Sequence, residues 1–337
     1  MISFDDILGH ASAIDWLTRA YTADRLPHGL IFAGPIGVGK ATTSRALGAV
    51  MLCENPKGVN ACGKCASCIA FEAGNHPDFR VVTKELIRYH DKTGKSKGIE
   101  LSINVLRPEL IEPAGRKAVM GRAKVFVIEQ AESMNAQAQN ALLKTLEEPA
   151  GRTAIILLTD QPGALLQTIN SRCQLVRFGA LSWDIVRKDL EHRKIDSKVA
   201  ARAGELSEGS LGLALKWIED AVITSAEELI TQIEAALDGT APDDLPGWMK
   251  KAADAYAEKQ LARDPLSSKD QATREGLNLY LMLAANRMRA ALLSSADADA
   301  LERVCTAIDS VARAEMYLDA NVNTALVLQQ LSIALSH

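Results

Sequence analysis

The chain has 337 residues, of which 47% are hydrophobic, and this length predicts two or three domains with ordinary buried cores. Its formal net charge of −4 argues against a protein that binds nucleic acid through a broad basic face. The first residues do not form a secretory signal, and no apolar stretch approaches the roughly 18 residues of a membrane helix, so we expect a cytoplasmic protein without a membrane partner.

Short apolar runs in the first half of the chain predict β-strands. They lie at residues 28–34, 79–83, 124–129, 153–159 and 174–178. Continuous runs of this kind suit strands that are buried on both faces of a parallel sheet. Between them, residues 133–149 predict an amphipathic helix with Ser133 as its N-cap and Pro149 as its stop. We therefore expect a three-layer α/β domain with its ligand site at the carboxyl ends of the strands.

The strand pattern stops after residue 180, and helical patterns continue to the end of the chain. Two polar segments are predicted to be exposed loops. Residues 88–98 are partly basic, so we consider a DNA-facing role for them besides a solvated loop. Residues 238–247 are rich in Asp, Pro and Gly and are predicted to be a loop between helices.

A glycine-rich loop follows the first predicted strand. The segment AGPIGVGKA contains Gly34, Gly37, Gly39, Lys40 and Ala41. Its backbone N–H groups are of the kind that hold phosphates, and Lys40 would reach the β- and γ-phosphates. Ala41, however, stands where a Ser or Thr hydroxyl would hold magnesium. The next residue along a helix points about 100° away and cannot simply replace that hydroxyl.

The second half of such a site is an apolar strand that ends in acidic residues. Here the strand at 124–129 ends at Glu129, which is followed by Gln130 and, two positions later, Glu132. Glu129 could still serve a metal ion. Gln130 is the more damaging change, because an amide cannot accept a proton from an attacking water as a carboxylate can. We therefore expect a vestigial nucleotide site, formed by the loop residues and Glu129, in which ATP binding is weak or absent.

Four of the six cysteines lie close together in the sequence. Cys53, Cys62, Cys65 and Cys68 are separated by eight, two and two residues. In a cytosolic chain such a cluster favours a metal site over disulfides. Four thiolates can hold one structural zinc ion tetrahedrally, which we favour. An iron–sulfur cluster and unligated thiols are the alternatives.

Beyond the loop and the cysteines, the chain resembles the AAA+ clamp-loader subunits of bacterial DNA polymerase III. The resemblance covers about residues 4–215 and is carried by FDDILGHASAIDWLTRA (4–20), LLKTLEEP (142–149) and TINSRCQLVRF (168–178). It implies an AAA+ domain at 1–178 that contains a zinc module at 53–68. A helical lid at 179–220 and a C-terminal helical collar domain at 221–337 would follow.

Within this family, the altered residues resemble those of the member whose own nucleotide site is defective. The family carries a sensor Arg in the lid, and the matching position in GSLGLAL (209–215) is Gly212. Arg172 of the Ser-Arg-Cys motif is intact, and the resemblance implies that it acts in trans on the ATP of a neighbouring subunit. A structural salt bridge is the alternative role for Arg172. Arg107 matches a family position that faces DNA, with a solvated or salt-bridged Arg as its alternative.

The resemblance implies a subunit without catalytic activity of its own that helps load a sliding clamp onto primed DNA. Its partners would be the tau/gamma ATPases, the delta subunit and, through the complex, the clamp and DNA. One alternative is an active ATPase of the tau/gamma type, and another is a variant that binds nucleotide without hydrolysing it. A third is a stand-alone zinc-containing protein that binds nucleic acid.

Overall fold

The computed structural model of the chain describes residues 1–91, 100–120, 122–237, 244–264, 268–294, 298–320 and 322–335. The chain divides into two compact units. The first comprises Met1–Asp189 with Glu208–Leu213, and the second comprises Leu190–Ser207 with Ala214–His337. The helices at Trp183–His192 (α9) and Leu211–Glu219 (α11) each contain residues of both units.

A parallel five-stranded sheet forms the centre of the first unit, in the order β2-β3-β4-β1-β5. The strands are β1 Gly29–Ala33, β2 Phe79–Val82, β3 Lys124–Ile128, β4 Thr153–Thr159 and β5 Gln174–Arg177. β1 lies between β4 and β5, with Ala33 aligned with both Thr159 and Arg177. The expected strands and the parallel α/β sheet are therefore confirmed.

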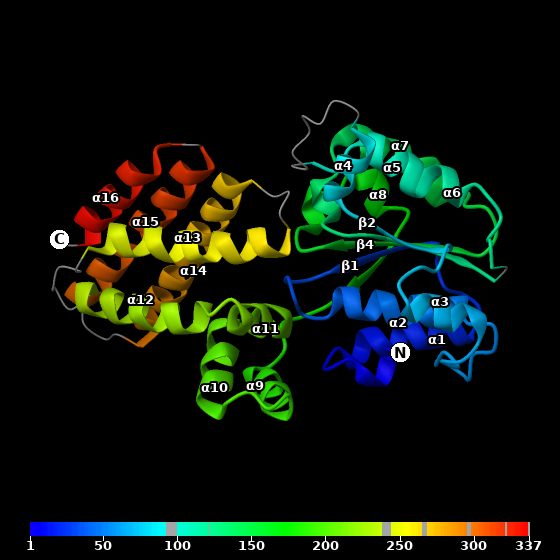
Figure 1. Cartoon of the computed structure of the whole chain (residues 1–337), viewed down its shortest axis with the longest axis horizontal. Coiled ribbons are helices and arrows are strands. Elements are labelled where there is room, and N and C mark those ends of the chain that lie inside the picture. Colours follow the sequence, from blue (N-terminus) through cyan, green and yellow to red (C-terminus); the bar gives the residue numbers. More distant parts are fainter. Residues whose placement is uncertain are drawn as a thin grey trace. The chain divides into compact units, whose positions relative to one another are not determined.

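Both faces of the sheet are covered by helices, as the continuous apolar strands require. In β1, Leu30 and Phe32 pack on one face with Leu17 and Leu47, whereas Ile31 belongs to the core of the other face. Figure 1 shows α1, α2 and α3 on one side of the sheet and α5, α7 and α8 on the other. The helices of this unit are α1 Ala11–Thr22, α2 Lys40–Leu52, α3 Ala66–Glu72, α4 Ile87–His90, α5 Ile103–Leu106, α6 Glu112–Ala114, α7 Ala136–Glu147 and α8 Gln167–Asn170.

The start of α7 differs from the prediction. Its N-cap is Asn135, whose side chain accepts a hydrogen bond from the N–H of Ala138 at 3.0 Å, and not Ser133. Ser133 ends a separate 3-10 turn, and Met134 is extended because its buried side chain packs in the core between the two segments. The helix ends at Glu147, before Pro149, as expected.

The described part of the second unit is helical. It contains α10 Ser197–Leu206, α12 Val222–Leu237, α13 Leu245–Arg263, α14 Lys269–Ser294, α15 Ala298–Asp319 and α16 Thr324–Leu335. Tyr280, Leu281 and Met288 of α14 are buried in the interior of this unit. The predicted loop at 238–247 lies outside the described residues as far as 243, and α13 already begins at Leu245. Most of the polar segment 88–98 also lies outside the described residues.

The predicted division into domains at 178 and 220 stays a prediction. The helices at 179–220 do not separate from both neighbours, because residues 208–213 belong to the first unit and residues 190–207 to the second. None of the described helices combines the length and the apolar composition that a membrane-spanning helix requires.

Candidate functional site

The glycine-rich loop lies where β1 ends, and the neighbouring strands hold it in place. The N–H of Gly34 donates to the carbonyl of Thr159, the last residue of β4, at 3.1 Å. A Cβ atom added to Gly34 would meet the carbonyl oxygen of Phe178, just after β5, at 2.0 Å. At the other end of the loop, Gly39 is the N-cap of α2 with φ +114°, a conformation that favours glycine. The loop therefore keeps the shape that its glycines predict.

Lys40 is 9% exposed and turns back onto its own loop. Its ammonium donates to the carbonyl oxygens of Gly34 and Pro35, the latter at 2.7 Å. Burial lowers the pKa of Lys40, while the charges of Asp160 and Glu132 raise it. The charge that a phosphate would contact is thus hydrogen-bonded within the loop.

The magnesium position in the first turn of α2 is Ala41. Ala41 is exposed and carries no hydroxyl. The hydroxyl of Thr43 donates to the carbonyl of Gly39 at 2.9 Å, and that of Ser44 to the carbonyl of Ala41 at 2.8 Å. These two hydroxyl groups therefore serve the helix backbone.

The acidic groups of the site come from the ends of two strands. Burial and the charge of Glu85 raise the pKa of Glu129, which follows β3, and Arg45 lowers it. Gln130 is exposed and in the left-handed conformation, with φ +49°. One buried carboxylate oxygen each of Glu132 and Asp160 lacks a hydrogen-bond partner among the described residues.

A short segment at 210–212 contacts the backbone of the loop. The hydroxyl of Ser210 donates to the carbonyl of Ile36 at 2.7 Å, and the N–H of Gly212 donates to the carbonyl of Gly37 at 2.8 Å. A Cβ atom added to Gly212 would lie 2.8 Å from Gly37 Cα, and one added to Gly37 would lie 2.2 Å from Ser210 Oγ. The position expected to carry a sensor Arg therefore has no room for a side chain in this arrangement.

Arg172 lies at a distance along the chain from this loop, in the turn between α8 and β5. Its guanidinium donates from Nε to Glu147 Oε1 at 2.6 Å, and its Nη2 contacts the same oxygen. Nη1 donates to the carbonyl of Thr168 at 3.0 Å. The salt bridge that sequence reasoning considered is present, with an exposed side-chain fraction of 34% for Arg172 and 48% for Glu147.

The four cysteines come together as the spacing predicts. Their sulfur atoms all lie within 4.8 Å of one another, and Cys62 Sγ is 3.9 Å from Cys68 Sγ. A tetrahedral site with Zn–S bonds of about 2.3 Å needs sulfur atoms about 3.8 Å apart. Cys53 closes α2 and Cys65 caps α3, so two helix ends hold the cluster. The donor set and its spacing therefore fit one metal ion.

The four thiols do not have the same environment. Backbone N–H groups of Lys64 and Cys65 lower the pKa of Cys62 to about 6. Burial raises the pKa of Cys53 and of Cys68. A bound cation would favour the thiolates that burial disfavours, because a coordinating thiol is deprotonated.

Hydrogen bonds tie the cysteine cluster to the sheet. Ser67 donates to the carbonyl of Leu52 at 2.7 Å, and its oxygen is 2.9 Å from Nε2 of buried His76. The Nδ1 atom of His76 accepts from the N–H of Asp78, the residue before β2, at 3.0 Å. The cluster is therefore anchored rather than attached by a loose loop.

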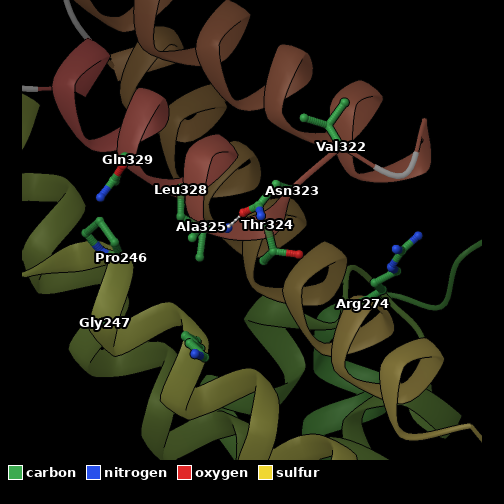
Figure 2. Close-up of a pocket in the computed structure, with 10 residues that line it drawn as sticks. Pro246, Gly247, Arg274, Val322, Asn323, Thr324, Ala325, Leu328 and Gln329 are labelled. Carbon is green, nitrogen blue, oxygen red and sulfur yellow. Dashed lines mark hydrogen bonds between the residues drawn. The ribbon is translucent and has the colours of Figure 1, made fainter.

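The second unit contains a pocket of about 530 Å³ that sequence reasoning missed (Figure 2). Its lining comes from the starts of α13 and α16 and from α14, so no local pattern in the sequence signals it. In this pocket Asn323 caps α16, accepting from the N–H of Ala325 at 3.0 Å. The lining residues are Pro246, Gly247, Lys250, Arg274, Val322, Asn323, Thr324, Ala325, Leu328 and Gln329.

Arg107 and Asp160 are two further charged residues of the first unit. Arg107 is exposed at the start of a π-helix, Arg107–Ile111. Asp160 escaped the sequence analysis, although its place directly after β4 signals the carboxyl edge of the sheet.

Comparison with known proteins places the sequence among replication proteins. Residues 9–182, more than half of the chain, match the family model of the DNA polymerase III delta subunit. A DNA polymerase III subunit delta' from Pseudomonas aeruginosa is 38% identical over 146 residues, which are 43% of this chain and 41% of the relative. The subunit delta' from Escherichia coli is 36% identical over 159 residues, 47% of this chain and 44% of the relative.

Other relatives are tau subunits. The DNA polymerase III subunit tau from Escherichia coli is 31% identical over 248 residues, 72% of this chain and 36% of that relative. The chain thus spans less than half of the length of these curated relatives. A solved DNA polymerase III gamma subunit-related protein from Thermotoga maritima is 20% identical to this chain, with a TM-score of 0.47. The match covers 96% of this chain and 98% of that protein.

The backbone contact at Gly212 predicts that this position does not accept a side chain. We expect Gly212→Ala to destabilise the protein by about 1–3 kcal/mol, because the new methyl would press against the backbone of Gly37. Gly163→Ala is the matched control, since a Cβ atom there meets nothing within 4 Å. Thermal unfolding of both variants measures the difference. Equal Tm values for the two would contradict the close contact.

Proposed function

Because the chain belongs to the DNA polymerase III delta-subunit family, we propose that it is a clamp-loader subunit that does not hydrolyse ATP itself. Delta' subunits are among the relatives of this chain. The altered residues Ala41, Gln130 and Gly212 resemble the defective nucleotide site expected of that clamp-loader member. Its partners would be the tau/gamma ATPases and the delta subunit. Through their complex it would help place a sliding clamp on primed DNA.

The observation that carries the proposal is the backbone contact between residues 210–212 and the glycine-rich loop. The close approach of Gly212 to Gly37 leaves no room for a sensor side chain at this position. Lys40 is held by the loop, and Ala41 offers no metal ligand. Together these features support weak or absent ATP binding and no hydrolysis.

Arg172 supports a role in the hydrolysis of ATP by a neighbour. Its side chain is one-third exposed and reaches the surface from a fixed turn. We assign it as an arginine finger acting in trans, which would stabilise charge that develops on the transferred phosphoryl group. This subunit would then contribute to the chemistry of a partner without an active site of its own.

The remaining assignments follow from the same family. Zinc would be held by Cys53, Cys62, Cys65 and Cys68 as a structural ion. The units would correspond to an AAA+ domain with its zinc module, a helical lid and a C-terminal collar domain. Arg107 would contact a DNA phosphate.

The rival functions have less support from the site. An active ATPase of the tau/gamma type would need groups in place of the hydroxyl at Ala41, the carboxylate at Gln130 and the Arg at Gly212. A variant that binds nucleotide without hydrolysing it would need Lys40 to leave the loop carbonyls and reach a phosphate. A stand-alone zinc protein that binds nucleic acid is disfavoured, because the family match covers the glycine-rich loop and the Arg172 motif as well as the cysteines.

The first prediction of this proposal concerns ATP hydrolysis by the chain alone. We expect the purified protein and its Lys40→Ala variant to show the same background rate with magnesium, because the catalytic groups are missing. A purified tau/gamma subunit provides the positive control. A clear rate that Lys40→Ala abolishes would contradict the proposal and favour the active ATPase.

The second prediction concerns Arg172 in a complex reconstituted with the tau/gamma and delta subunits of the same organism. We expect Arg172→Ala to slow ATP hydrolysis at the one site that it completes by about 10³-fold or more. Single-turnover hydrolysis in the presence of clamp and primed DNA measures this as a slow phase, together with slower clamp loading. Unchanged kinetics in a complex of normal composition would refute the role in trans.

The third prediction concerns the metal. Protein prepared without chelator should contain about one zinc ion per chain, and Cys62→Ala should lose it and lower Tm. Cys305→Ala is the control, because Cys305 is an exposed thiol of α15 outside the cluster. Iron with a visible charge-transfer absorption would indicate the iron–sulfur alternative. Absence of any metal would remove the assignment.

A further inference from the structure

We infer that Glu147 is a positioning residue for Arg172, fixing the direction of its guanidinium for use by the neighbouring subunit. The inference rests on the proposed role of Arg172 in trans. It adds a second residue to that role, one that would act only through Arg172 and would not itself reach the partner's nucleotide.

Both residues start from fixed points of the fold. Glu147 is the last residue of α7 and follows Leu146, which is 4% exposed and packed in the core. The backbone at Arg172 is equally constrained, because a Cβ atom added to Gly29 of β1 would lie 3.2 Å from the carbonyl oxygen of Arg172. The same added atom would lie 2.7 Å from Sγ of Cys173. The ion pair between Arg172 and Glu147 therefore sets the direction of the Arg172 side chain.

The contacts of the guanidinium restrict it from two sides. Nε and Nη2 both contact Oε1 of Glu147. On the other side, Nη1 donates to the carbonyl of Thr168 at 3.0 Å and to the hydroxyl of Ser171 at 3.4 Å. Because the guanidinium is planar, contacts at Nε and at both terminal nitrogens fix its plane as well as its position.

The solvent exposure of the Arg172–Glu147 pair indicates that Glu147 orients the guanidinium and does not permanently neutralise its charge. A salt bridge that is open to solvent contributes little to stability and is readily exchanged. It can nevertheless hold the long Arg172 side chain in one rotamer before the reaction. The entropy cost of ordering that side chain is then not added to the transition state. Glu147 can therefore orient Arg172 without holding it back from a phosphate.

The test uses the complex reconstituted with the partner subunits of the same organism, with clamp and primed DNA. We expect Glu147→Ala to slow the phase of ATP hydrolysis that depends on Arg172 by roughly 10- to 100-fold. Glu147→Gln, which keeps an acceptor oxygen but no charge, should lie between Glu147→Ala and the unchanged protein. The apparent KM for ATP should stay the same, because the neighbour's own groups bind the nucleotide.

Glu148→Gln is the matched control, since it removes the same charge at the next position. Among the described residues, the hydrogen bonds of the Arg172 guanidinium go to Glu147, Thr168 and Ser171, and none goes to Glu148. Glu148→Gln should therefore leave the kinetics unchanged. Thermal unfolding and gel filtration of each variant confirm folding and entry into the complex.

A double variant shows whether Glu147 acts through Arg172. Glu147→Ala combined with Arg172→Ala should be no slower than Arg172→Ala alone. Additive losses would overturn the inference, and so would faster hydrolysis by Glu147→Ala, which would mean that Glu147 restrains Arg172. If Arg172→Ala slows hydrolysis and Glu147→Ala does not, the inference fails while the proposed function stands. If Arg172→Ala has no effect, both fail.

Discussion

The position of β1 between β4 and β5 is the constraint on which the candidate site depends. This arrangement brings the carbonyl of Thr159 and the carbonyl of Phe178 against Gly34, on either side of the start of the glycine-rich loop. The loop therefore has little freedom to change shape, whether or not it binds a phosphate. Packing against the sheet is enough to hold the form of the loop, and this is compatible with the proposed loss of its chemistry.

A second consequence concerns charge. A buried ammonium must find acceptors, and Lys40 finds them in the carbonyls of Gly34 and Pro35. The N–H of Gly212 takes a further carbonyl of the same loop, that of Gly37. The ammonium of Lys40, which a phosphate would contact, is thus already satisfied within the protein. Contact between Lys40 and a phosphate would require breaking its hydrogen bonds to the loop, so the proposed loss of ATP binding involves packing as well as single residues.

Much of this could be read from the sequence, for identifiable reasons. The apolar runs predicted the strands, because strands buried on both faces of a parallel sheet are apolar throughout. The spacing of Cys62, Cys65 and Cys68 indicated one metal site, because the short loops between them keep the thiols close together. The N-cap of α7 was misplaced, because the burial of Met134 is a tertiary effect that no local pattern contains. Asp160 was missed, and the partner of Arg172 could not be identified, since Glu147 lies 25 residues earlier in the chain.

The altered positions Ala41 and Gly212 differ from Arg172 in how the fold depends on them. Ala41 is an exposed departure that the fold tolerates, whereas the close backbone contact at Gly212 makes glycine necessary there. Arg172 is different, because an exposed arginine that pairs with an exposed glutamate contributes little stability. Folding alone gives no strong reason to hold its guanidinium from both sides. A side chain that is ordered while adding little to stability is the physical basis for the proposal that Arg172 acts on a partner.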